Sequence, residues 1–115
     1  MSLAKSGTKA VRGSTTGRPV MVLLDLLGRR WSLRILWELR HGPLTSRALR
    51  EACDDASPTV LQARLSELRA AGLVRHEKAS GYAVTDLGRE FLTSFMPLYS
   101  FAERWAARQP EEPTP

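Results

Sequence analysis

Residues 57–72 constrain the fold of this 115-residue chain more than any other segment. Ser57 can cap a helix by accepting a hydrogen bond from a free backbone N–H, and Pro58 suits the first helical position, where its missing N–H costs nothing. Gly72 favours the left-handed conformation that commonly ends a helix. Between these signals, leucines recur at helical spacing and form one apolar stripe of Leu61, Leu65 and Leu68. The segment therefore predicts a capped amphipathic helix.

The side of this helix opposite the leucines is short, polar and uncharged. It carries Thr59, Gln62, Ala63 and Ser66. A solvated helix face usually carries Lys and Glu, whereas small polar side chains let a helix approach a surface closely and hydrogen-bond to base edges in a major groove. Two interpretations stay open from this helix alone, a plain surface helix and a DNA-reading helix. The flanking segments favour the second.

Those flanking segments predict a mostly α-helical chain with one small β-hairpin. Four further helices are expected, at residues 19–28, 31–40 and 46–53, and from Asp86 to beyond Trp105, with Thr45 and Thr85 as caps of the last two. Residues 73–78 and 82–85 favour extended strands around a tight turn at 79–81. The brief Asp54-Asp55-Ala56 turn between two helices indicates a helix-turn-helix.

The last expected helix carries more apolar surface than one small domain can readily cover. Its stripe consists of Leu87, Phe91, Phe95, Leu98, Ala102 and Trp105, widened by Leu92, Met96 and Tyr99. Pro97 lies inside the run and should kink or restart the helix. Such an unpaired stripe points to a second copy of the same helix. The residues expected at a homodimer interface are Leu23, Phe91, Phe95, Leu98, Tyr99, Ala102 and Trp105.

An apolar pocket between the dimer helices is an alternative for part of that surface. Trp31, Phe91, Phe95 and Tyr99 would surround it, and it would take an unidentified small-molecule effector. Ordinary core packing is the stronger expectation for these residues.

The net charge of +5 is unevenly distributed along the chain. Residues 1–18 hold four basic and no acidic side chains, residues 19–109 hold 13 basic and 10 acidic ones, and Glu111 and Glu112 follow. We expect residues 1–18 to be a disordered basic tail and 109–115 a flexible tail around one domain at 19–108. A surplus of three positive charges in the domain is compatible with binding to nucleic acid, but it is a weak signal by itself.

Composition also excludes several classes of protein. With no membrane-length apolar run and no secretory signal, we expect a cytoplasmic, nucleoid-associated protein that does not bind membranes. One cysteine excludes an intrachain disulfide framework. The two His residues, the Cys and the acids show no catalytic or metal-ligand spacing, so neither an enzyme, a metal site nor a cofactor is expected.

Several segments together resemble the HxlR-type bacterial transcriptional regulators, winged helix-turn-helix proteins of the MarR-like superfamily. The matching segments are LLGRRWSLRIL at 26–36, GPL at 42–44, VLQARLSEL at 60–68, GLV at 72–74 and YAVTDLG at 82–88, with Trp105 in the last helix. Their order and spacing are specific in combination and cover roughly residues 19–107.

The resemblance implies a homodimeric, sequence-specific regulator of transcription that binds a palindromic operator in double-stranded DNA. Residues 57–71 would enter the major groove, with Thr59, Gln62, Ala63 and Ser66 toward base edges. The residues expected at phosphates are Arg47, Arg64, Arg69 and Lys78. Arg64 lies nearer the leucine stripe on the helix, which leaves pairing with Glu67 as an alternative.

Three departures from the family pattern limit what the resemblance implies. Arg18 stands where many members carry a Cys that senses redox state in some of them, and Cys53 lies elsewhere. Thr45-Ser46 replaces the usual Arg-Phe, and the wing is short. The missing Arg and the modest charge slightly favour the alternative to DNA binding, a winged-helix protein–protein interaction module without DNA binding.

Overall fold

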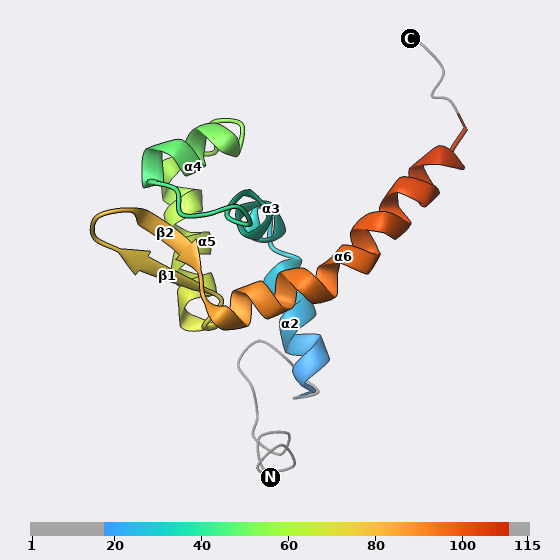
Figure 1. The fold of residues 1–115 in the computed structure, drawn as a ribbon, viewed down its shortest axis with the longest axis horizontal. Coiled ribbons are helices and arrows are strands. Elements are labelled where there is room, and N and C mark those ends of the chain that lie inside the picture. The colour runs from blue at the N-terminus through green and yellow to red at the C-terminus, as the bar shows by residue number, and fades with distance from the viewer. Residues whose placement is uncertain (1–17, 111–115) are drawn as a thin grey trace.

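The computed structural model describes residues 18–110, which form five helices and one antiparallel hairpin (Figure 1). The elements are α2 (Pro19–Leu27), α3 (Ser32–Glu38), α4 (Ser46–Ala52), α5 (Pro58–Ala70), β1 (Val74–Glu77), β2 (Gly81–Val84) and α6 (Asp86–Ala107). The expected basic tail, apart from Arg18, and residues 111–115 of the expected C-terminal tail lie outside the described residues. The mostly helical fold with a small hairpin is confirmed.

The core forms around α3, as its apolar composition predicts. Ile35, Leu36 and Leu39 are fully buried. They pack in one cluster with the α5 leucines and with Leu49 of α4. Burial of the leucine stripe confirms which side of α5 faces inward. Within residues 18–110, no helix is long and apolar enough to span a membrane.

Two threonines cap helices as the sequence predicts. Thr45 Oγ1 accepts a hydrogen bond from the Ala48 N–H at 3.1 Å at the start of α4. Thr85 Oγ1 accepts one from the Gly88 N–H at 3.0 Å and donates to the Gly72 carbonyl at 2.6 Å. Thr85 therefore joins the first turn of α6 to the residue that follows α5.

The two ends of α5 differ in how they compare with expectation. Gly72 adopts φ +81°, and the N–H groups of Gly72 and Leu73 bond to the carbonyls of Arg69 and Leu68 at 3.0 Å each, which is the Schellman ending. Ser57 occupies the cap position, but its side chain makes no capping hydrogen bond among the described residues. The expected Ser57 side-chain cap is therefore wrong.

The hairpin pairs Val74 with Val84 and Glu77 with Gly81. Its turn lies at residues 78–80, one residue earlier than expected, because Gly81 already belongs to β2. Gly81 has φ +97°, and a Cβ there would lie 2.3 Å from the Leu44 carbonyl oxygen. Both constraints require glycine. Leu44 and Tyr82 exchange backbone hydrogen bonds of 2.9 and 2.8 Å, which tie β2 to the segment before α4.

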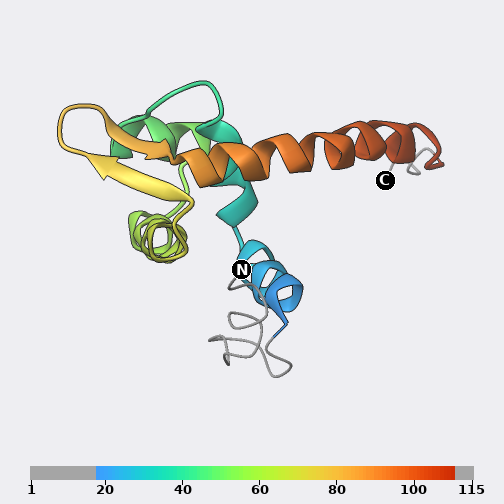
Figure 2. The same cartoon turned by 60° about the horizontal axis from the view of Figure 1, so that its bottom comes forward.

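The last helix, α6, runs unbroken through Pro97 and projects beyond the rest of the domain (Figures 1 and 2). Pro97 removes the hydrogen bond to the Thr93 carbonyl, but both residues are exposed, so water can reach that carbonyl. The helix therefore does not restart at Pro97. Every residue from 96 to 110 is exposed.

Cys53 is fully buried in the core beside α3. Burial raises the pKa of its thiol, while the nearby Arg34 guanidinium acts in the opposite direction. We expect the native thiol to react with iodoacetamide at least about 100-fold more slowly than the urea-unfolded thiol, since the reaction needs an exposed thiolate. Mass spectrometry of timed samples measures both rates. Equal rates would show that Cys53 is accessible in the native protein.

Candidate nucleic-acid interface

The side of α5 away from the core presents the small polar residues that the sequence analysis selected. Thr59, Gln62 and Ser66 are exposed and Ala63 is half-buried, whereas no α5 leucine is more than 1% exposed. The only acid of α5, Glu67, lies 3.2 Å from Arg29 and 3.2 Å from Arg64, so its charge is offset by two cations. This surface, called the α5 outer face below, is therefore polar without an unopposed negative charge.

Two arginines hold the turn that sets the angle between α4 and α5. Arg34 Nη2 donates to the Ala52 carbonyl at 2.7 Å and its Nη1 to Asp54 at 3.3 Å, and Arg50 Nε donates to the Ala56 carbonyl at 3.3 Å. Asp54 and Asp55 both adopt left-handed backbone conformations, with φ +54° and +57°. These bonds support a conformation that is costly for residues other than glycine.

Three of the four expected phosphate contacts are exposed. They are Arg47, whose side chain is 90% exposed, Arg69, and Lys78 in the hairpin turn. Arg64 differs, because its side chain is only 19% exposed and its Nε faces the Glu67 carboxylate. This geometry matches the alternative of pairing with Glu67, which the sequence left open for Arg64.

The remaining charges of the hairpin bind each other. Arg75 Nε donates to Glu77 at 2.7 Å and its Nη1 to the Val84 carbonyl at 3.0 Å, while Ser80 Oγ donates to Glu77 at 2.6 Å. The hydrogen bonds from Ser80 and Arg75 lower the pKa of Glu77. Arg75 therefore stabilises the hairpin, and the exposed Lys78 is the cation that its turn presents.

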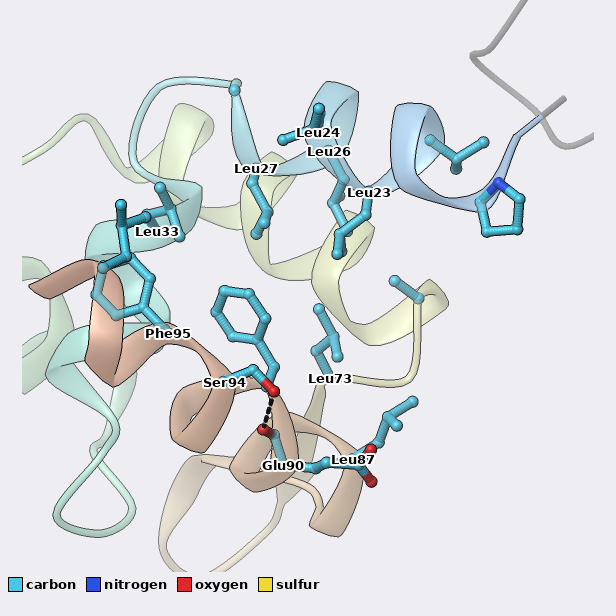
Figure 3. Close-up of a pocket in the computed structure, with 16 residues that line it drawn as sticks. Leu23, Leu24, Leu26, Leu27, Leu33, Leu73, Leu87, Glu90, Ser94 and Phe95 are labelled. Carbon is cyan, nitrogen blue, oxygen red and sulfur yellow. Dashed lines mark hydrogen bonds between the residues drawn. The ribbon is translucent and has the colours of Figure 1, made fainter. Parts of the chain in front are cut away.

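A second surface is an apolar groove of about 890 Å³ between α2 and α6, shown in Figure 3. Leu23 and Leu27 of α2 point across it toward α6, and Leu73 lies at its base. On the α6 side the groove is lined by Leu87, Glu90, Phe91, Ser94, Phe95 and Leu98. Of the described residues of α2, none is buried within this chain. We call this surface the α2–α6 groove.

The expected dimer residues fall into two groups. Leu23, Leu98, Ala102 and Trp105 are exposed, and Phe91 packs in part against the core. The rings of Phe95 and Tyr99 contact Trp37 of the same chain, at centroid distances of 6.0 and 5.0 Å, and Tyr99 remains 41% exposed. Sequence reasoning missed Phe101, which is 50% exposed. Its spacing of three residues after Leu98 and four before Trp105 was the available signal.

Within one chain, the four aromatic residues suggested for a ligand pocket between the dimer helices do not line the same hollow. Phe91 and Phe95 line the α2–α6 groove, but Tyr99 does not, and Trp31 lines a separate hollow with Arg30, Asp54 and Asp55. Within residues 18–110 there is no cluster of three or more His, Cys, Asp or Glu that could hold a metal ion.

Comparison with known proteins connects this arrangement to transcriptional regulators. The HTH-type transcriptional regulator sll1512 of Synechocystis is 25% identical over 97 residues, which cover 79% of this chain and 72% of the relative. The quinone-bound YodB from B. subtilis superposes with a TM-score of 0.69 at 26% identity, covering 74% of this chain and 96% of that one.

A possible HxlR family transcriptional factor from Thermoplasma volcanium also superposes with a TM-score of 0.69 at 26% identity, covering 78% of this chain and 86% of that one. Such regulators are not enzymes. The HxlR-like helix-turn-helix family matches residues 26–110, most of the chain. The winged helix-turn-helix architecture and this match agree with the motifs in the sequence. The chain belongs to the HxlR-like helix-turn-helix family.

Proposed function

We propose that this protein is a homodimeric transcriptional regulator that binds a specific sequence of double-stranded DNA, with α5 in the major groove. The observation that carries the proposal is the α5 outer face, where Thr59, Gln62 and Ser66 are exposed above a fully buried leucine stripe. A helix with short side chains on its outer face can approach base edges closely, and these residue types hydrogen-bond to them. Membership of the helix-turn-helix family supports the same assignment.

In this proposal the exposed cations position the protein and contribute affinity without selecting sequence. Arg47 and Arg69 lie on α4 and α5, and Lys78 lies at the tip of the hairpin. Phosphate contacts of this kind release counterions, so binding weakens as the salt concentration rises. Arg64, which faces Glu67, contributes by holding α5 together rather than by contacting DNA in this conformation.

Replacing Lys78 with alanine should reduce the slope of log affinity against log salt concentration by about one unit. The reason is the loss of a single phosphate contact. Fluorescence anisotropy with an operator duplex at several salt concentrations measures the slope. Lys78→Arg keeps the charge and is expected to keep the slope. An unchanged slope in Lys78→Ala would place the hairpin turn away from DNA.

The second copy in the proposal covers the α2–α6 groove. The groove is lined as far as Leu98, and beyond it α6 carries further exposed apolar side chains, so that Leu98, Phe101 and Trp105 are each about half exposed. An apolar surface of this length fits the same helix of a second subunit better than it fits a compact ligand. For this reason we assign the groove to the partner subunit and not to a small-molecule effector.

Selection of bound duplexes from a random DNA pool, followed by sequencing, tests the proposed function. We expect enrichment of one inverted repeat with half-sites about one DNA turn (~34 Å) apart, because a twofold dimer presents two α5 helices. Enrichment of a single half-site would contradict the dimer. A pool that remains random would contradict DNA binding and favour a protein–protein interaction module.

A further inference from the structure

Gln62 is the residue at which α4, α5 and β2 meet. Its Nε2 donates to Ser46 Oγ, and its Oε1 accepts from the hydroxyl of Tyr82, both at 3.4 Å. Both distances exceed the usual range for hydrogen bonds of these types, about 2.5–3.2 Å, so each contact adds little to the stability of the fold. Ser46 and Tyr82 are 16 and 20 residues away in the sequence, on two different elements.

Tyr82 is held firmly enough to act as a fixed reference for Gln62. It is 7% exposed, and its backbone exchanges two hydrogen bonds with Leu44. His76 packs on its ring at a centroid distance of 4.7 Å. The hydroxyl therefore has little freedom to move away, and the Gln62 side chain loses less conformational entropy when it binds a base.

The bonds within the protein leave a defined set of partners for DNA. A glutamine amide has two N–H donors and two acceptor lone pairs on its oxygen. Ser46 takes one donor and Tyr82 fills one lone pair, so one donor and one acceptor remain. In the major groove, adenine presents N6–H as a donor beside N7 as an acceptor. These two groups match the remaining acceptor and the remaining donor of the amide. Guanine presents two acceptors, and the amide has only one N–H left for them.

We propose that Tyr82, together with Ser46, positions the Gln62 amide to read the adenine of an A·T base pair. Tyr82 is then a specificity-determining residue that does not itself touch the base. This inference rests on the proposed function, since it requires α5 in the major groove. It adds the identity of one base pair and the residues that fix its recognition.

The test measures binding of full-length protein to defined duplexes by fluorescence anisotropy. The probes are the selected operator, versions with each of the other three base pairs at one position in each half-site, a version with 7-deazaadenine there, and an unrelated duplex. We expect one A·T position where wild-type protein loses about 5- to 150-fold affinity on substitution. Gln62→Ala should lose this preference and become indifferent to 7-deazaadenine, which lacks the N7 acceptor.

Tyr82→Phe keeps the ring and removes only the hydroxyl. It should reduce the A·T preference by about 2- to 10-fold, with melting temperature and binding to the unrelated duplex unchanged. Ser46→Ala, at an exposed position, should act in the same direction and provides a second test if Tyr82→Phe folds poorly. In a Gln62→Ala background, Tyr82→Phe should have no further effect on the preference.

Two failures are distinguishable in this design. If wild-type protein enriches no sequence, the proposed function fails and this inference fails with it. If wild-type protein has an operator but both Tyr82→Phe and Ser46→Ala keep the full A·T preference, only the positioning role is overturned. Equal weakening on every duplex, or a lowered melting temperature without loss of preference, would assign Tyr82 a structural role instead.

Discussion

Replacing Leu98 with aspartate is expected to dissociate the proposed dimer and to abolish operator binding at concentrations where the wild-type protein binds. Leu98 lines the α2–α6 groove and is 54% exposed in the single chain, so an unpaired carboxylate there would be buried on dimerisation. Burying it costs about 3–5 kcal/mol. The dimer dissociation constant should rise at least about 100-fold, and both copies carry the change. Sedimentation equilibrium over a concentration series measures this constant.

Ser100→Asp is the matched control for this substitution. It adds the same charge two residues later, on the opposite side of α6, because successive helical residues turn by about 100°. Ser100 is exposed in the single chain, and we expect the variant to remain dimeric. A Leu98→Asp protein that stays dimeric would place the interface elsewhere. A monomeric wild-type protein would remove the dimer from the proposal altogether.

Replacing Leu65 with alanine is expected to cost about 2–5 kcal/mol of unfolding free energy, through lost burial and the cavity left behind. Leu65 is 1% exposed and lies at the centre of the leucine stripe that joins α5 to α3. Urea unfolding followed by tryptophan fluorescence measures the change, with the protein concentration held constant because the proposed dimerisation would contribute to apparent stability.

Ser66→Ala provides the comparison on the adjacent, exposed side of α5. Its effect on unfolding should stay within about 0.5 kcal/mol. Similar stability of the two variants would mean that the leucines do not form the inner side of α5, contrary to the structure. Greater loss in Ser66→Ala would reverse the orientation of the helix and with it the assignment of the α5 outer face.

Local signals predicted most of the fold. Thr45, Thr85 and Gly72 act on backbone groups within a few residues, so residue type and spacing sufficed to place the helix ends. Ser57 shows the limit of this reasoning, since a residue at the cap position does not always accept a capping hydrogen bond with its side chain. The hairpin turn lies one residue earlier than expected because Gly81 belongs to β2. The backbone of Gly81 lies close against Leu44, which is distant in sequence.

The candidate site depends more on contacts between distant segments, which a single sequence does not reveal. Helical periodicity separated the α5 outer face from the leucines. It could not show that Glu67 also binds Arg29, 38 residues away, or that Tyr82 reaches Gln62. Likewise, the apolar stripe on α6 was visible in the sequence, but the contacts that Phe95 and Tyr99 make with Trp37 depend on the packing of α3 against α6.

The Thr85 side chain has a consequence for how this regulator assembles. Its hydroxyl bonds the Gly72 carbonyl just past the end of α5 and the Gly88 N–H in the first turn of α6. One side chain therefore joins the C-terminal end of the helix proposed to read a half-site to the N-terminal end of the helix proposed to hold the second subunit. We expect a displacement of one of these helices to change the position of the other. In the proposed homodimer, such coupling would be reciprocal, and operator binding would strengthen subunit pairing by the same factor by which pairing strengthens operator binding. At low protein concentration, two subunits would then associate on the operator DNA and not before binding it.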